Sequence, residues 1–139
     1  MAGNTNPIFS KVGDIQWGST PLLTSNATTD LTTGTSYLIY TADATNGGYV
    51  QKIRFRSLGT NVATVVRVWI NNGSTTGTAS NNTLYDELSL ASSTASTTSA
   101  LAVYELPLNF ALPPSYRLYC TLGTTVAVGY DATVIGGKY

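Results

Sequence analysis

The sequence contains no histidine, although histidine is the side chain that most often acts as general base, proton shuttle or metal ligand. Nucleophilic triads of the Ser-His-Asp or Cys-His type are therefore excluded, because both need an imidazole to take up the proton. The single cysteine, Cys120, lies in the apolar run 116–122, where we predict a small core residue. No glycine-rich phosphate loop opens a helix, so nucleotide chemistry is not indicated either.

Three carboxylates, Asp86, Glu87 and Glu105, could in principle hydrolyse a glycosidic bond, which needs two carboxylates about 5 to 9.5 Å apart. Adjacent residues of a strand face opposite sides, so Asp86 and Glu87 cannot form the pair. A small hydrolase built from Glu105 and one of the other two stays open, although we favour solvated strand residues. Asp43 beside Asn46 has too few neighbouring carboxylates for a calcium loop, and we predict that it caps a turn. We expect no enzyme, cofactor or metal.

A basic stripe is the sharpest polar feature: Lys52, Arg54 and Arg56 alternate with apolar residues, as on a strand with one buried face. The stripe is either a solvated strand face, which we favour, or a docking site for an acidic patch, because guanidinium groups form bidentate pairs with carboxylates. Trp17 is interpreted first as a core residue and second as an interface anchor. The nine tyrosines could stack on sugars, but most lie in strand runs where an aromatic ring packs.

The composition indicates a neutral polar surface. The chain has 139 residues, which fits one domain. Seven basic and seven acidic residues cancel, and charged residues make up only 10%, so nothing draws the chain to nucleic acid or to an anionic membrane. The N-terminus lacks a basic start with an apolar stretch, and no apolar run approaches the ~20 residues of a membrane helix. We expect a soluble protein that is made in a cytoplasm.

The apolar stretches are short, rich in Val, Ile, Thr and Tyr, and alternate with polar residues, which predicts strands rather than helices. We expect an all-β fold: an antiparallel, jelly-roll-like β-sandwich of about eight strands in one domain over 12–139. A flexible N-terminal arm, 1–11, carries Ile8 and Phe9 and is expected to dock on a neighbour. The candidate strands are 12–17, 20–25, 36–42, 49–58, 62–71, 83–90, 101–108, 115–122 and 125–135.

Further expectations concern how these strands connect. Strands 49–58 and 62–71 are predicted to form a hairpin, with Tyr49 on the same face as Ile53 and Phe55. Strand 62–71 is apolar on both faces, so it is either central or covered by a partner. The loops 71–82 and 91–100 are predicted to be exposed and mobile. The region around Pro107, Pro113 and Pro114 is expected to end a strand and bend, and Gly136 with Gly137 to release a free tail.

Two stretches carry a family resemblance. Residues 48–74, GYVQKIRFRSLGTNVATVVRVWINNGS, and residues 106–113, LPLNFALP, resemble small proteins encoded among the head genes of tailed phages, as do YRL at 116–118 and LGTTVA at 122–127. They are similar to the jelly-roll cement, or decoration, proteins of phage capsids. The resemblance spans most of the chain and rests on strand and turn patterns. It implies a virion protein that binds the outside of an assembled capsid without catalysis.

The resemblance implies that the partner is the major capsid protein and that the protein strengthens the shell by spanning neighbouring capsomers. Self-association is expected, as a dimer at a two-fold axis or alternatively a trimer. Two alternatives remain: a tail-associated receptor- or carbohydrate-binding module, and a tail or baseplate subunit. The candidate partner contacts are Ile8, Phe9, Trp17, Lys52, Arg54 and Arg56.

Overall fold

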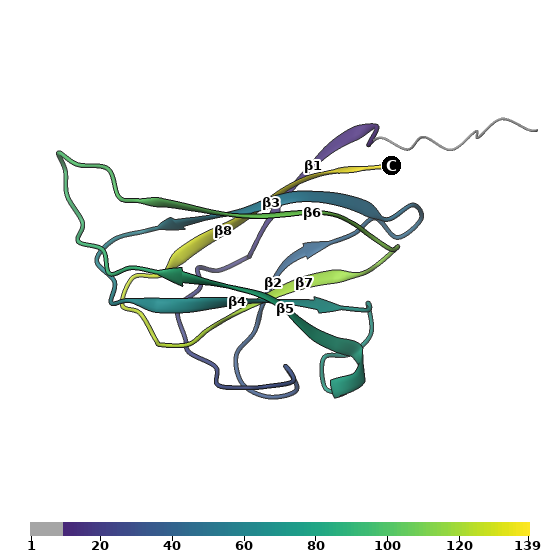
Figure 1. Ribbon diagram of the computed structural model, residues 1–139, viewed down its shortest axis with the longest axis horizontal. Helices are drawn as coiled ribbons and strands as arrows, with labels where there is room; N and C mark the ends of the chain where they lie inside the picture. Colours follow the sequence, from purple (N-terminus) through teal and green to yellow (C-terminus); the bar gives the residue numbers. More distant parts are fainter. Residues whose placement is uncertain (1–9) are drawn as a thin grey trace, which may run out of the picture.

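The computed structural model describes residues 10–139, which form two layers of strands (Figure 1). Ile8, Phe9 and most of the predicted arm lie outside these residues. The helical structure within 10–139 is confined to a 3-10 turn, η1, in the loop after β4. The elements are β1 Val12–Trp17, β2 Tyr37–Thr41, β3 Gly48–Ser57, β4 Thr64–Asn71, η1 Ala79–Asn81, β5 Asn82–Leu90, β6 Val103–Leu112, β7 Arg117–Leu122 and β8 Tyr130–Lys138.

The strands form two four-stranded antiparallel sheets. Sheet A has the order β1-β8-β3-β6 and sheet B the order β2-β7-β4-β5. The first strand pairs with the last, the second with the seventh, the third with the sixth and the fourth with the fifth. A long hairpin rolled up on itself gives this pairing, which is the jelly-roll arrangement. The predicted fold class is confirmed.

The core lies between the two sheets because alternate residues of each strand point inward. Ile53 and Phe55 of β3 meet Val66 and Val68 of β4 there, and all four are buried. Cys120 of β7 lies in the same cluster, as predicted. Burial raises the pKa of its thiol far above the usual value, so this cysteine is an inert core residue.

The predicted hairpin of β3 and β4 is wrong, because the two strands lie in different sheets. The connection between them crosses from sheet A to sheet B and is held by the buried side chain of Asn61. Its Oδ1 accepts the N–H groups of Val128 and Gly129, and its Nδ2 donates to the Gly129 carbonyl at 3.0 Å. A short connection in the sequence is compatible both with a hairpin and with a crossing between the sheets. The hydrogen bonds of Asn61 to a distant part of the chain favour the crossing.

A β-bulge overturns the predicted facing of Tyr49. The register of β3 against β8 shifts between Val50 and Lys52, where Gln51 is an extra residue on β3, so the alternation changes there. The register against β6 shifts at the same point, but there the extra residue is on β6. Val50 is buried in place of Tyr49. Tyr49 lies on the outside, where its hydroxyl donates to Asn109 Oδ1 at 3.2 Å.

Three other boundaries differ from expectation. Segment 20–25 is extended but forms only isolated bridges, at Leu22 and Ser25. Pro107 lies inside β6 rather than at its end, which an edge strand tolerates because one side of its ladder is unpaired. Gly136 and Gly137 belong to β8 and release no tail: a methyl group at position 136 would overlap the carbonyl oxygen of Tyr49 on β3.

The outer face of sheet B is covered around Trp69 by the protein's own chain, whereas Leu84 and Tyr85 of β5 stay exposed. Strand β4 is central, as one interpretation predicted, and its outward Trp69 is fully buried, with the indole Nε1 donating to Thr121 Oγ1 at 3.0 Å. The segment between β1 and β2 runs across this side (Figure 1). Residues 27–29 of that segment line a hollow together with Trp69, and Asn82 Nδ2 binds the Asp30 carbonyl. The loops 72–81 and 91–100 are largely exposed, as predicted.

Candidate functional site

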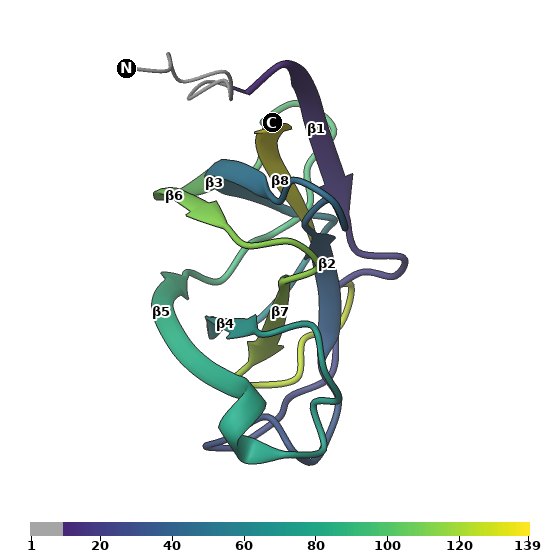
Figure 2. The same ribbon diagram turned by 90° about the vertical axis from the view of Figure 1, so that its right-hand side faces the viewer.

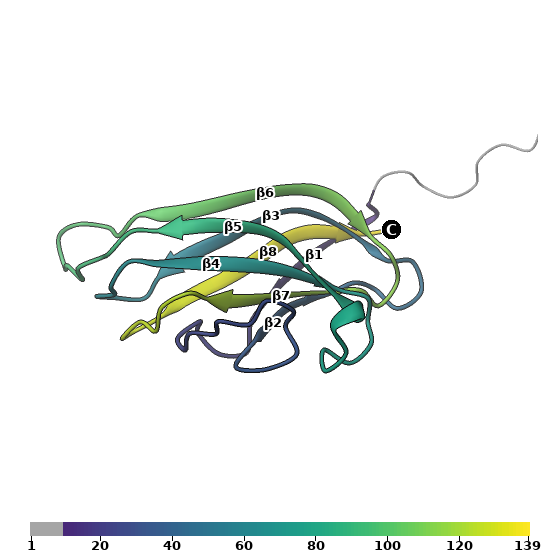
Figure 3. The same cartoon turned by 60° about the horizontal axis from the view of Figure 1, so that its bottom comes forward.

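The outer face of sheet A differs from that of sheet B because no described segment lies over it. Viewed end-on, sheet A forms one side of the sandwich, and the β1–β2 and β4–β5 connections lie beyond sheet B (Figure 2). In the view turned by 60°, the strands of the two sheets overlap and run in roughly the same direction (Figure 3). An open sheet face presents its side chains to whatever approaches, so this surface is the first place to look for a partner site.

Register places four of the six predicted contact residues on this face. Trp17 lies opposite Thr133, Thr133 opposite Arg54, and Arg54 opposite Glu105, so one row crosses all four strands. The next row consists of Ile15, Ile135, Lys52 and Pro107. Paired residues of antiparallel strands point to the same side. We call this surface the sheet A face and define it by Ile15, Trp17, Lys52, Arg54, Arg56, Glu105, Asp131, Thr133 and Ile135.

The first interpretation of Trp17, a core residue, is wrong, because this side chain is 67% exposed. Its neighbours in β1 explain the difference: Asp14 and Gln16 occupy the inward positions, so the indole must point outward. Ile15, on the same face, is 58% exposed. The buried indole of the protein belongs to Trp69 instead.

The charges on the sheet A face are partly paired. Lys52 Nζ lies 3.0 Å from Glu105 Oε2, and Arg56 Nη1 donates to the Leu101 carbonyl at 3.1 Å. Within residues 10–139 the exposed Arg54 has no ion-pair partner and no side-chain hydrogen bond within the protein. Its five N–H donors are therefore open to a carboxylate of another molecule.

The carboxylates considered for hydrolysis are not brought together. Glu105 pairs with Lys52 on the outer face of sheet A. Glu87 pairs with Arg67 Nε at 2.9 Å on β4 and β5 of sheet B. Asp86 accepts the N–H of Glu87. Glu105 and Glu87 thus lie on the outer sides of different sheets, which is no arrangement for a shared substrate.

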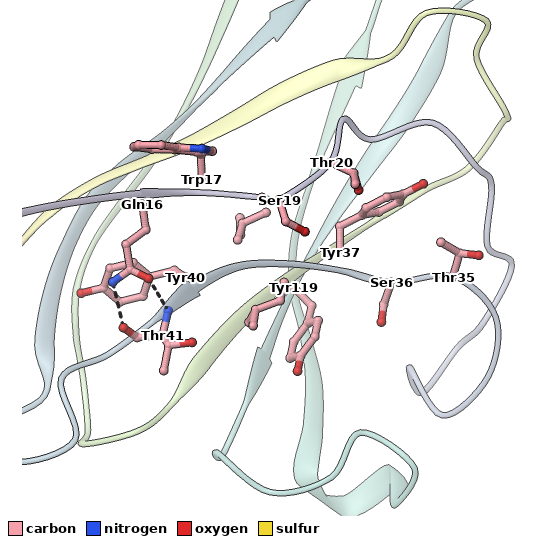
Figure 4. Close-up of a pocket in the computed structure, with 13 residues that line it drawn as sticks. Gln16, Trp17, Ser19, Thr20, Thr35, Ser36, Tyr37, Tyr40, Thr41 and Tyr119 are labelled. Atoms are coloured by element: carbon pink, nitrogen blue, oxygen red, sulfur yellow. Dashed lines mark hydrogen bonds between the residues drawn. The ribbon is translucent and has the colours of Figure 1, made fainter.

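A polar network joins β1 to β2 along one side of the sandwich. Gln16 binds the backbone of Thr41 (Figure 4), and the Tyr40 hydroxyl donates to Asp14 Oδ2 at 3.0 Å. Gln16 Nε2 also lies 3.1 Å from Asp14 Oδ1. Burial, followed by the hydrogen bond to Asp14, raises the pKa of the Tyr40 hydroxyl far above its usual value. The phenol therefore stays a proton donor to Asp14, and the network ties the two sheets together.

Beside this network an open groove of about 540 Å³ runs between the edges of the two sheets. Tyr37 and Tyr119 line it together with the hydroxyls of Ser19, Thr20, Thr35 and Ser36 (Figure 4). The Tyr37 hydroxyl already accepts the N–H of Thr24 at 2.9 Å. No pattern in the sequence indicated this groove, because the residues that line it come from segments distant in the chain.

The turn prediction for Asp43 is confirmed. Its Oδ1 accepts the backbone N–H groups of Asn46 and Thr45, and these two bonds lower the pKa of the carboxyl below its usual 3.8. The pKa of Asp30 is lowered in the same way, because its carboxylate accepts hydrogen bonds from the hydroxyl and N–H groups of Thr32 and from the hydroxyl of Thr28. Nowhere in the described part of the chain do three Cys, Asp or Glu side chains gather as a metal site would need.

Comparison of the chain with models of protein families, with curated proteins and with solved structures gave no match. No helix within residues 10–139 is long and apolar enough to cross a membrane. The functional proposal below therefore depends on the fold, its surfaces and the sequence resemblance.

Proposed function

We propose that the protein is a structural virion subunit that binds the outer surface of a phage capsid and stabilises the contacts between capsomers. The observation that carries the proposal is the row of side chains on the sheet A face, which combines the exposed Trp17 with the unpaired Arg54. Part of the opposite face, around Trp69, is covered by the protein's own residues 27–30, whereas no described segment lies over the sheet A face.

The sheet A face has the composition of a binding surface. Trp and Arg are the residues most enriched among those that dominate binding energy, because each offers a large contact area with directed donors. Ile15 and Ile135 lie opposite each other beside Trp17 and extend the apolar area. The neighbouring charges, the Lys52–Glu105 pair above all, would form a polar rim of the kind that surrounds such contacts.

The charge of the face favours an acidic protein partner. The face has a net charge of +1, because it carries three positive side chains, Lys52, Arg54 and Arg56, and two negative ones, Glu105 and Asp131. This is too little for a phosphate backbone, which binds through many cations. It suits one or two carboxylates on the major capsid protein. Many copies on a repeating shell would make a modest affinity sufficient.

The groove between β1 and β2 supports a second candidate, a tail-associated module that binds a receptor saccharide. Tyrosine rings and several hydroxyls meet there, and sugars bind to such mixed surfaces by stacking and hydrogen bonding. Titration of the purified protein with a panel of host surface glycans tests this candidate. Binding that is lost in Tyr119→Ala would favour it over the capsid proposal, whereas a tail or baseplate subunit would be recognised by its position in the particle.

Retention on heads tests the proposal directly. Heads of the phage that encodes the protein, prepared without it, are mixed with wild-type protein, Trp17→Ala or Arg54→Glu, and the bound fraction is measured by sedimentation. We expect at least a tenfold loss of affinity for each variant, as for a residue worth more than about 1.4 kcal/mol at an interface. Two control variants change side chains away from the sheet A face and should bind as the wild type does: Val62→Ala at an exposed position and Arg117→Glu at a half-buried one.

A further inference from the structure

The four outer strands of the two sheets differ in how their unpaired edges are protected. Strand β2 has a register irregularity between Leu38 and Tyr40. The β4–β5 ladder is shifted at Trp69, and β6 contains Pro107 beside the bulge of β3. Bulges and prolines are the usual devices that keep an edge from pairing with another chain. Strand β1 has neither, since its six residues keep an unbroken register with β8.

Strand β1 also presents apolar side chains and no outward charge. Val12 is 62% exposed, and Ile15 and Trp17 are exposed to a similar degree. Its single charged residue, Asp14, is buried and bound by Tyr40 and Gln16. Every second residue of an edge strand leaves its N–H and C=O groups without a ladder partner. A second strand approaching β1 would therefore meet open hydrogen-bonding groups and no charge repulsion from the outward side chains.

We propose that the occupant of this edge is a second copy of the chain, whose β1 pairs antiparallel with the first about a two-fold axis centred on Ile15. A two-fold axis perpendicular to the sheet keeps the sheet A faces of both copies on the same side. Residues that oppose each other must also face the same way, so the axis must pass through a residue position.

Charge then selects the register. An axis at Asp14 would set the two Asp14 carboxylates against each other, which disfavours pairing. An axis at Gln16 would shorten the overlap of the two strands by two residues. An axis at Ile15 instead sets Asp14 against Gln16 of the second copy, and a carboxylate facing an amide donor is compatible.

The same register makes the side chains fit. Ile15 meets Ile15 of the second copy, and Trp17 lies opposite Gly13 of the second copy. Gly13 has no side chain, and no heavy atom lies within 4 Å of the position that a Cβ would take. The space above this glycine can therefore receive the indole ring. The pairing joins the two sheets A into one eight-stranded sheet.

The contact is small. One paired strand with three large exposed side chains buries roughly half of the ~800 Å² per partner found in standard interfaces. We expect a weak dimer, with a dissociation constant of about 10 µM to 1 mM. This inference refines the self-association within the proposed function, since a dimer on a two-fold axis of a shell would double the sheet A face. It concerns the purified protein, however, and is tested without any capsid.

Disulfide trapping tests the pairing. The chain has one cysteine, Cys120, which is buried, so Ile15→Cys adds a single accessible thiol at the proposed axis. Strand pairing sets the two Cα atoms about 4.5 to 5.5 Å apart, within the range that a disulfide spans. We expect mild oxidation to give a covalent dimer in most of the Ile15→Cys protein. Val103→Cys, at an exposed position on the interrupted edge β6, should stay largely monomeric.

Sedimentation of the unmodified chain supplies the second readout. The weight-average mass of the wild type should rise with concentration to at least about one and a half times its chain mass near ~1 mM, and Ile15→Lys should remain a monomer because lysine on an edge strand opposes pairing. A wild type that is monomeric throughout, an Ile15→Lys protein that dimerises as well as the wild type, or equal cross-linking of the two cysteine variants would overturn the inference. Failure of the dimer tests, with wild-type protein still retained on heads, refutes the dimer alone. A wild-type protein that forms the dimer but is not retained on heads refutes the proposed function alone.

Discussion

The side-chain amide of Gln16 pairs with the backbone of Thr41 as a neighbouring strand would. Its Nε2 donates to the Thr41 carbonyl at 2.9 Å, and its Oε1 accepts the Thr41 N–H at 2.9 Å. One residue of β1 thus closes the ladder at the end of β2, an edge strand of the opposite sheet. Edge strands are commonly blunted by such local devices, and this one also links the two layers of the sandwich.

Removal of this amide should destabilise the fold. We expect Gln16→Ala to lower the free energy of unfolding by about 1–2 kcal/mol, because two hydrogen bonds are lost and the Thr41 groups are left unpaired. Urea denaturation measures the change. Gln51→Ala is the matched control, because Gln51 is exposed in the bulge of β3 and should change stability by less than about 0.5 kcal/mol. Equal effects of the two substitutions would contradict the role given to Gln16.

The indole of Trp69 depends on one acceptor. Thr121→Val keeps the shape of the side chain but removes the oxygen that accepts the buried Nε1–H. We expect a loss of about 1–3 kcal/mol, the cost of an unsatisfied buried donor, measured by chemical denaturation. Thr133→Val makes the same exchange on the sheet A face, where water can replace any lost contact, and should be nearly neutral. An unchanged free energy of unfolding in Thr121→Val would mean that the indole N–H of Trp69 finds another acceptor.

Strands β3 and β8 approach each other so closely at Gly136 that only glycine fits there. We expect Gly136→Ala to destabilise the protein by more than about 3 kcal/mol or to prevent folding, because its methyl group would meet the carbonyl of Tyr49 on β3. Yield of soluble protein and the thermal midpoint report the effect. Gly77→Ala, in the open loop after β4, should fold normally. A well-folded Gly136→Ala protein would show that β3 and β8 can separate there without cost.

The Asp43 cap predicts a dependence on pH. Its folded-state pKa lies below the usual 3.8 because Asn46 and Thr45 donate to the carboxylate. A lowered pKa stabilises the folded state above about pH 3.8, and this contribution is lost as the pH falls through the folded-state value. The advantage of the wild type over Asp43→Ala should therefore shrink in acid, as read from urea midpoints.

Asp43→Asn is the control for this titration. Asparagine keeps an acceptor oxygen for the turn but cannot ionise. Its advantage over Asp43→Ala should stay constant over the same pH range. If the wild-type advantage also stays constant, the carboxylate charge plays no part in the turn.

The sequence predicted the fold class and most of the strands because alternation along a strand is a local property. It identified β1, β2, β3, β4, β5 and β7 to within two residues at either end, and the exposed loops between them. Which strands pair with each other could not be predicted from the sequence. The crossing after β3 depends on bonds between Asn61 and Gly129, 68 residues apart, and the facing of Tyr49 depends on a bulge that no composition rule reveals.

The candidate site shows the same division. The stripe of Lys52, Arg54 and Arg56 was visible because its period is two. That Trp17 shares a row with Arg54 follows only from the order β1-β8-β3 and its register. The first interpretation of Trp17 as a core residue was wrong because the inward positions beside it hold the polar residues Asp14 and Gln16. The burial of Trp69 fits the prediction that strand 62–71 is central, and it depends on a distant segment that lies beside the ring.

Electron cryo-microscopy, at side-chain resolution, of intact particles that carry the protein tests the central proposal most directly. The account predicts the jelly roll on the outside of the capsid, with the sheet A face against the shell, Trp17 buried there and Arg54 beside an acidic side chain of the major capsid protein. A particle that lacks the protein on its head, holds it in the tail, or binds it through the outer side of sheet B would contradict the account.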